Sequence, residues 1–398
     1  MLKAKLYKHI KTNTMTSRSS PLSTKIGLAN LGNTCFLNVV LQALRISPPV
    51  GSIFLSSPST SVIRRHDSKK KEMATAFQTL IRDFWGTEIP VTSAPTLIAR
   101  GFMHSMITVL RETGDDWYHH GQQADAAEAL QYIMDSLHDA MYRSVKMDVA
   151  GVSHNDEEAS QVKAIESWAK FFSKEYSPIV QQFNGQTQIC IKCETCGAKS
   201  ERYEPWLMVK APIPGADKPG SEVPTMIKCL DSAFEPETLD DYNCDECKTK
   251  GKATIQSKIS RLPPVTIVSL KRFTNRGHKV CGKVEWDLDE LDFRPWMAFR
   301  RDPFTNSTEA PVYTTFAVIE HLGSTMGGHY RMFSRQDDTW LEYDDSSVRI
   351  VDPDHVVTSN SYIAFMMPKT AMESMNAAFA KQIQQFRTYK ESLKAKEA

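Results

Sequence analysis

The chain has 398 residues, of which 41% are hydrophobic and 24% are charged, and its formal net charge is +1. This length and apolar content allow a sizeable buried core and two or three subdomains. The near balance of acidic and basic residues argues against a nucleic-acid partner, and no apolar run approaches the ~20 residues of a membrane span. We therefore expect a soluble globular protein that binds neither nucleic acid nor membrane.

Residues 1–23 contain lysines and an arginine but no acidic residue, followed by a run rich in Ser and Thr. The segment lacks the apolar core of a signal peptide. It is predicted to be a disordered basic tail.

The next segment predicts a helix that begins at Cys35, because the following residues repeat an apolar stripe at helical spacing: Leu37, Val40, Leu41 and Leu44. The Gly-Asn-Thr sequence at 32–34 predicts a tight turn and an N-cap before it. Backbone N–H groups at a helix start favour a thiolate. We interpret Cys35 as a nucleophile in an exposed turn, and the alternative is a buried structural cysteine.

Two further helices are predicted over 73–85 and 126–141, where apolar residues again recur at helical spacing. They are expected to pack around the Cys35 helix. Between 145 and 166 the hydrophobicity is low and an Asn-Asp-Glu-Glu run occurs at 155–158, which indicates an exposed insertion. A helix is expected to resume through Ile165 and Trp168.

Two Cys-x-x-Cys pairs predict a zinc ribbon, because four thiolates complete a tetrahedron around structural Zn²⁺: Cys193, Cys196, Cys244 and Cys247. Cys190 has the same spacing to Cys193, but Gly197 favours the register that starts at Cys193. The long segment between the pairs implies two strands that return to one tip. Free thiols and metal-ligating cysteines indicate a reducing compartment, either cytoplasmic or nuclear.

A β-hairpin is predicted around His329, which begins an alternating strand. A polar turn at 335–338 leads into a second strand that ends at Asp344 and Asp345, so an aspartate returns to the side of the histidine. Because side chains alternate across a strand, the two aspartates should point in opposite directions. With Cys35, these residues supply a nucleophile, a base and an orienting acid.

Residues 369–398 carry apolar residues near heptad spacing among many charges. This pattern predicts an amphipathic helix that lies outside the domain before it. An exposed helix of this kind is a candidate site for a protein partner.

The segment GLANLGNTCFLN (27–38) resembles the cysteine box of the ubiquitin-specific proteases, a papain-like family of deubiquitinating enzymes. HLGSTMGGHYRMF (321–333) and WLEYDDSSV (340–348) resemble the family's histidine box. Shorter matches are DAAEAL (125–130), LPPVTIVSLKRF (262–273) and SYIAFMM (361–367), with Ala129 at a position where the family usually has Phe. The resemblance assigns 24–368 to a catalytic domain, with fingers at about 180–260.

This resemblance implies an α+β papain-like fold with a helical thumb, a β-rich palm and zinc-ribbon fingers that grip ubiquitin. It implies hydrolysis of the (iso)peptide bond after the C-terminal glycine of ubiquitin. Cys35 would attack, His329 would carry the proton and Asp344 would orient the imidazole. The Cys35 backbone N–H and the Asn30 side chain would bind the oxyanion. Asp345 would act through water on the oxyanion side or substitute in part for Asp344, and its alternative role is to cap the turn before Ser346 and Ser347.

Three alternatives remain at this point. The chain could bind ubiquitin without cutting it, process a different ubiquitin-like modifier, or be a zinc-ribbon binding module without enzymatic activity. For Asn30, the alternative role is a turn former.

Overall fold

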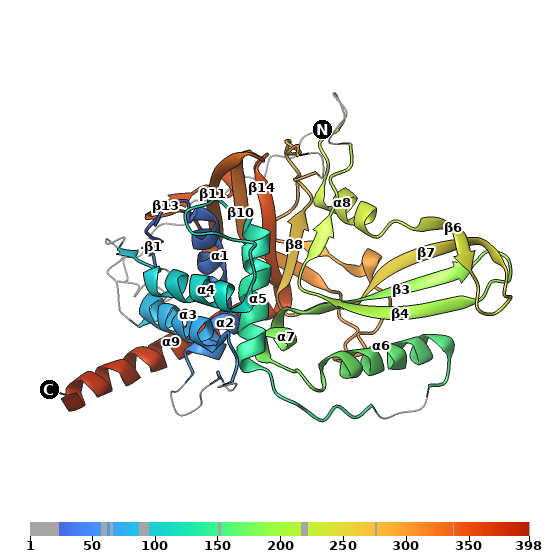
Figure 1. Ribbon diagram of the computed structural model, residues 1–398, viewed down its shortest axis with the longest axis horizontal. Helices are drawn as coiled ribbons and strands as arrows, with labels where there is room; N and C mark the ends of the chain where they lie inside the picture. The colour runs from blue at the N-terminus through green and yellow to red at the C-terminus, as the bar shows by residue number, and fades with distance from the viewer. Residues whose placement is uncertain are drawn as a thin grey trace, which may run out of the picture.

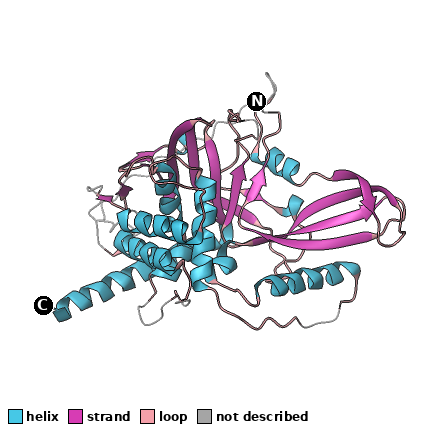
Figure 2. Cartoon of the chain, in the orientation of Figure 1, coloured by secondary structure: helices cyan, strands magenta, loops and turns pink. Residues whose placement is uncertain are grey.

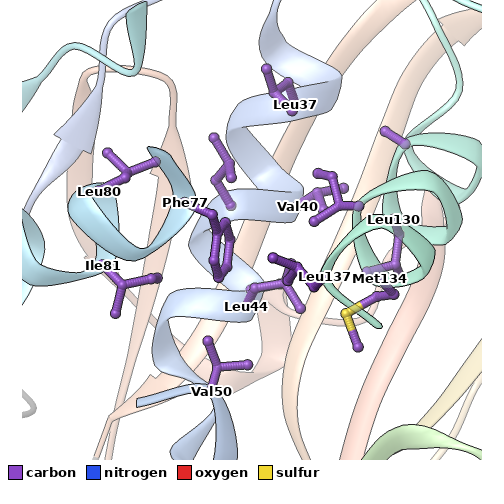
Figure 3. Close-up of a cluster of buried hydrophobic side chains, with 14 of the residues drawn as sticks. Leu37, Val40, Leu44, Val50, Phe77, Leu80, Ile81, Leu130, Met134 and Leu137 are labelled. Carbon is purple, nitrogen blue, oxygen red and sulfur yellow. The ribbon is translucent and has the colours of Figure 1, made fainter. Parts of the chain in front are cut away.

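The apolar stripe after Cys35 forms helix α1 (Cys35–Ile46), in which every residue is buried. The helical layer around α1 contains α2 (Pro48–Phe54), α3 (Lys71–Trp85), α4 (Arg100–Thr113), α5 (Ala126–Met141) and α7 (Pro178–Phe183). Of these, α2 and α5 contact α1 most, whereas α4 packs on α3 and α7 packs on α5. Leu44 lies between Phe77 of α3 and Leu137 of α5 (Figure 3). Helices α3 and α5 are thus the two helices that the apolar spacing predicts at 73–85 and 126–141, and they belong to the helical thumb.

The computed structural model describes residues 24–56, 62–63, 67–86, 95–149, 153–215, 222–274, 277–336 and 338–397. The predicted disordered tail at 1–23 lies outside the described residues. No helix within these ranges combines the length and the apolar character needed to cross a membrane.

The second layer is an eight-stranded sheet, the palm, which lies beside the thumb (Figure 2). Its strand order is β13-β12-β11-β10-β14-β8-β5, and β9 pairs with β10. The bounds are β5 (Val209–Ala211), β8 (Thr266–Leu270), β9 (Leu291–Asp292), β10 (Val312–Ser324), β11 (Gly327–Gln336), β12 (Thr339–Asp344), β13 (Ser347–Val351) and β14 (Ser361–Pro368). The antiparallel pairing of β11 with β12 is the hairpin predicted around His329.

A separate four-stranded sheet extends away from the palm and forms the fingers (Figure 1). Its order is β4-β3-β7-β6, with β3 (Gly185–Cys193), β4 (Lys199–Trp206), β6 (Glu237–Asn243) and β7 (Lys250–Arg261). Helix α8 (Met226–Ala233) precedes β6. Shorter elements are β1 (Gly27–Leu28), β2 (Thr96–Leu97), η1 (Arg294–Trp296) and η2 (Pro353–His355).

Helix α6 (Asp156–Phe172) corrects the prediction for 145–166. The acidic run is exposed at 155–157, as predicted, but it forms the first turn of this helix and does not precede it. Asn155 caps it, since its side chain accepts a hydrogen bond from the Glu158 N–H at 2.9 Å. Negative charge is favourable there because it opposes the positive end of the helix dipole. Ala164 and Trp168 face the fingers and are buried.

Helix α9 (Lys369–Glu397) forms where the amphipathic pattern predicts it, but it does not stand apart from the preceding domain. Phe379, Ile383 and Phe386 are at most 9% exposed and belong to the main core cluster. The Phe379 ring packs edge-on against Trp85 of α3, with 5.2 Å between the ring centroids. The Arg387 guanidinium donates to the Trp85 carbonyl at 2.9 Å. The middle of α9 is therefore part of the thumb.

Candidate active site

The turn before Cys35 is organised by the side chain of Asn30. Its Oδ1 accepts hydrogen bonds from the backbone N–H groups of Gly32 at 3.0 Å and Thr34 at 3.2 Å. Gly32 has φ +99° and Asn33 has φ +56°, so the chain reverses through two left-handed residues before the helix begins. Asn30 therefore acts as a turn former through Oδ1, and neither N–H of its Nδ2 group takes part in these turn hydrogen bonds.

Cys35 begins α1 as predicted, but its thiol is not exposed. The residue is 4% exposed, and burial raises the pKa of the thiol, although the backbone N–H of Tyr330 acts in the opposite direction. The expectation of an exposed turn that favours a thiolate is therefore wrong for this state of the protein. The physical reason is that β11 packs against the start of α1 and excludes water.

His329 and Asp344 meet across the β11–β12 hairpin. The distance from His329 Nε2 to Asp344 Oδ1 is 2.6 Å, and both side chains are about two-fifths exposed. This contact uses Nε2 and leaves Nδ1 available. The thiol of Cys35 reaches the backbone of Tyr330, the residue after His329. Among the described residues, no hydrogen bond joins the thiol to the imidazole ring.

The prediction that strand alternation points the two aspartates in opposite directions is wrong, because β12 ends at Asp344 and Asp345 lies in the turn after it. One carboxylate oxygen of each aspartate and a ring nitrogen of His329 lie within 4.8 Å of one another. Asp345 Oδ2 accepts from Asn30 Nδ2 at 2.9 Å, and Asp345 Oδ1 accepts from Asn38 Nδ2 at 2.7 Å. Asp345 has φ +48°, and its carbonyl accepts from the Leu28 N–H at 2.8 Å. The hairpin that carries Asp344 is therefore fastened to the turn that carries Asn30.

Sequence reasoning missed Asn38 and Gln123. The Gln123 side-chain amide pairs with the backbone of Gly328 in both directions, with its Nε2 donating to the carbonyl and its Oε1 accepting from the N–H, each at 2.9 Å. Gly328 cannot carry a side chain, because a Cβ would lie 2.1 Å from the Leu322 carbonyl oxygen. For Gln123 the available signal was a polar residue next to the matched segment at 125–130, and for Asn38 it was a polar residue inside the matched segment at 27–38.

A cleft of about 960 Å³ lies between the thumb and the palm and reaches the start of β11. Residues that line it include Gln123, Asp125, Tyr132, His321, Gly327 and Tyr330. Burial lowers the pKa of His321 to about 4, so this second histidine stays neutral at physiological pH. His321 is therefore a poor candidate for the base, and His329 remains the candidate.

The four cysteines of the two Cys-x-x-Cys pairs come together at the tip of the fingers. Sγ of Cys193 lies 3.9 Å from Sγ of Cys247, and Sγ of Cys196 lies 3.7 Å from Sγ of Cys244. Cys190 is not in this cluster, so the register that starts at Cys193 is the one that brings four ligand atoms together. These four cysteines can hold a structural metal ion.

The family model described as ubiquitin carboxyl-terminal hydrolase matches residues 26–366. The chain belongs to the ubiquitin carboxyl-terminal hydrolase family. It is 30% identical to ubiquitin carboxyl-terminal hydrolase Usp2 of Drosophila melanogaster, covering 88% of this chain and 35% of the relative. It is 28% identical to ubiquitin carboxyl-terminal hydrolase 21 of Mus musculus, covering 86% and 61%. This member of the family thus spans less than two thirds of the length of these relatives.

Among solved structures, the fold resembles that of the SAGA Ubp8/Sgf11/Sus1/Sgf73 DUB module bound to ubiquitin aldehyde. The TM-score is 0.65 at 23% identity, and the match covers 89% of this chain and 71% of that one. The α+β fold predicted for this family member is thereby confirmed, and the cysteine cluster is consistent with the zinc ribbon.

The buried thiol makes a testable prediction for the substrate-free protein. Alkylation of Cys35 by iodoacetamide should keep accelerating as the pH rises past about 8.5, the ordinary value for a thiol, because only the thiolate reacts. Its rate is measured by mass spectrometry of the Cys35 peptide, and the exposed Cys281 in the same digest serves as reference. A rate that already levels off near neutral pH would contradict the raised pKa.

Proposed function

We propose that this chain is a cysteine protease that hydrolyses the (iso)peptide bond after the C-terminal glycine of ubiquitin. The observation that carries the proposal is the 2.6 Å contact between His329 and Asp344, formed beside the helix start that holds Cys35. Membership of the ubiquitin carboxyl-terminal hydrolase family supports it.

In the proposed reaction, Cys35 Sγ attacks the carbonyl carbon of the terminal glycine, and the thiol proton moves to Nδ1 of His329. The imidazolium then protonates the leaving amine, and a thioester joins Cys35 to ubiquitin. Water attacks the thioester carbonyl while His329 accepts its proton. The C–S bond then breaks, His329 returns the proton to Cys35 Sγ, and ubiquitin leaves with a free C-terminal carboxylate. Asp344 holds Nε2 and stabilises the imidazolium, so Nδ1 faces the thiol when substrate tightens the site.

The oxyanion of each tetrahedral intermediate would be bound by the Cys35 backbone N–H and by Asn30 Nδ2. The Asn30 amide has two N–H donors, and one of them is already bonded to Asp345. The second remains for the substrate oxygen. Asp345 thus acts by holding the oxyanion donor rather than by replacing Asp344.

Hydrolysis of ubiquitin–rhodamine tests the proposal, with ubiquitin-like counterparts measured in parallel. We expect release of rhodamine from the ubiquitin substrate at the highest kcat/KM. Preferential cleavage of a different ubiquitin-like modifier would make that modifier, and not ubiquitin, the proposed substrate. Binding of ubiquitin without any turnover would instead favour an inactive scaffold.

We propose that the metal at the finger tip is zinc. A tetrahedron with Zn–S distances of about 2.3 Å requires sulfur atoms about 3.8 Å apart. The separations of 3.9 Å for Cys193 with Cys247 and 3.7 Å for Cys196 with Cys244 fit this requirement. Zinc bound there would hold the tip of the fingers together.

The predicted partner is ubiquitin or a ubiquitinated protein.

A protein partner for the distal part of α9 also remains a proposal. Tyr389 and Leu393 are 37% and 40% exposed there, beyond the part of the helix that packs on the thumb. Replacing both with serine should leave cleavage of ubiquitin–rhodamine unchanged and weaken only binding of such a partner.

The two aspartates should differ when each is replaced by alanine. We expect Asp344→Ala to lower kcat/KM by about 10²–10³-fold, less than the 10⁴-fold of the comparable serine-protease change, because a thiolate is more nucleophilic. Asp345→Ala should cost less and be non-additive with Asn30→Ala, since Asp345 holds Asn30. Steady-state kinetics on one ubiquitin substrate measure both effects. If Asp345→Ala lowers kcat/KM more than Asp344→Ala does, then Asp345, and not Asp344, orients His329.

A further inference from the structure

A buried asparagine lies one helical turn after Cys35. Asn38 is 3% exposed on a helix whose other positions are mostly apolar. Burying an amide costs free energy unless its hydrogen bonds are satisfied. Its Nδ2 donates to Asp345 Oδ1 at 2.7 Å and to the carbonyls of Ala29 at 3.3 Å and Leu28 at 3.4 Å. The two N–H groups of the Asn38 amide are thus shared among three acceptors.

Two of these three contacts lead to Asn30. Ala29 is the residue before it, and the Asp345 carboxylate accepts from Asn30 Nδ2 at 2.9 Å. One carboxylate oxygen is held by Asn38 and the other is left to hold Asn30. Hydrogen bonds to a carboxylate at 2.7–2.9 Å are of the short, charge-assisted kind.

We propose that Asn38 is a positioning residue for the oxyanion donor, acting on the Asn30 amide through the Asp345 carboxylate and the Ala29 carbonyl. The inference rests on the proposed function, because Asn30 has a role in catalysis only if an oxyanion forms beside it. Without Asn38, the carboxylate is free to rotate and the Asn30 amide loses its fixed direction. An oxyanion donor is effective only when it is already aimed at the developing charge.

Gln42 provides a matched control on the same helix. It is 2% exposed, lies one turn further along α1, and its Nε2 donates to the carbonyl of Ile26 at 2.7 Å. Like Asn38, it fastens the segment around β1 to α1, but its hydrogen bonds do not reach Asn30 or Asp345. Replacing Gln42 therefore also removes a buried amide, together with its hydrogen bond from Arg45 Nε, but it leaves the contact between Asn38 and Asp345 in place.

The kinetic experiment compares Asn38→Leu with Gln42→Leu on ubiquitin–rhodamine at a temperature where both are folded. We expect Asn38→Leu to lower kcat by about 10–100-fold, less than the 10²–10³-fold cost of removing an oxyanion donor, with KM nearly unchanged. Gln42→Leu should lower the melting temperature but keep kcat within about twofold. Asn38→Ser serves if the leucine variant does not fold. Equal losses of kcat at both positions would overturn the proposal.

A double-mutant cycle tests whether the effect passes through Asn30. In an Asn30→Ala background, Asn38→Leu should cost little more, because the group it positions is already absent. Full additivity of the two losses would contradict the proposed route.

A readout independent of turnover separates this inference from the proposed function. The side-chain NH₂ resonances of Asn30 are followed in protein labelled with ¹⁵N-asparagine and assigned with Asn30→Ala. We expect them to move in Asn38→Leu and not in Gln42→Leu. Unmoved resonances would refute the positioning role. A wild-type protein that cleaves no ubiquitin substrate, with resonances that do move, would refute the proposed function alone.

Discussion

Replacing Cys35 with alanine is expected to abolish hydrolysis of ubiquitin substrates while ubiquitin still binds. The thiol forms the covalent bond in the proposed reaction, and removing a nucleophile from a comparable serine protease costs about 10⁶-fold in kcat. Binding should persist because Cys35 is only 4% exposed and offers little contact area. Turnover of ubiquitin–rhodamine and fluorescence anisotropy with labelled ubiquitin measure the two properties separately.

Cys281→Ala is the control for this experiment, because Cys281 is an exposed free thiol outside the site. It should retain wild-type turnover. Hydrolysis that survives in Cys35→Ala would end the cysteine-protease interpretation.

Replacing Cys244 with serine is expected to release the metal and loosen the fingers. Structural zinc contributes its binding free energy to folding, about 10–16 kcal/mol in small zinc-finger peptides, so a four-thiolate site loses much of this when one ligand is removed. Hydrogen exchange should accelerate in β6 and β7, which carry the tip, and remain slow in α1. Elemental analysis of the wild-type protein should find one zinc per chain.

Cys190→Ser is the matched control, because Cys190 lies on β3 of the same sheet but outside the cluster of four cysteines. Its zinc content and hydrogen exchange should resemble those of the wild type. Wild-type protein that is fully active without zinc would contradict the assignment of the metal.

The elements that the sequence predicted well are those defined by local periodicity. The α1 stripe and the hairpin between His329 and Asp344 both follow from side-chain spacing, which depends only on near neighbours. The start of α6 is also encoded locally, by Asn155 and Glu158 as an N-cap pair. Residues 155–157 are exposed as predicted, but the helix begins within the acidic run and not after it.

The features that could not be predicted depend on contacts between distant parts of the chain. Cys35 is buried because β11 covers the start of α1, and no local pattern reports that packing. Asn38 looks like a polar interruption of an apolar stripe until the hairpin places Asp345 against it. Likewise, Gln123 contacts Gly328 only after thumb and palm meet.

The candidate site joins residues that are far apart in the sequence, and this has a consequence during synthesis. Asn38 and Asp345 are 307 positions apart, and at about 5–20 residues per second the ribosome needs on the order of 15–60 s to make that interval. The Phe379 side chain that completes the thumb core is translated later still. While this interval is being made, a nascent chain therefore carries its nucleophile without the partners that would make it reactive, and it gains the proposed activity only after the Asp345 hairpin has been translated.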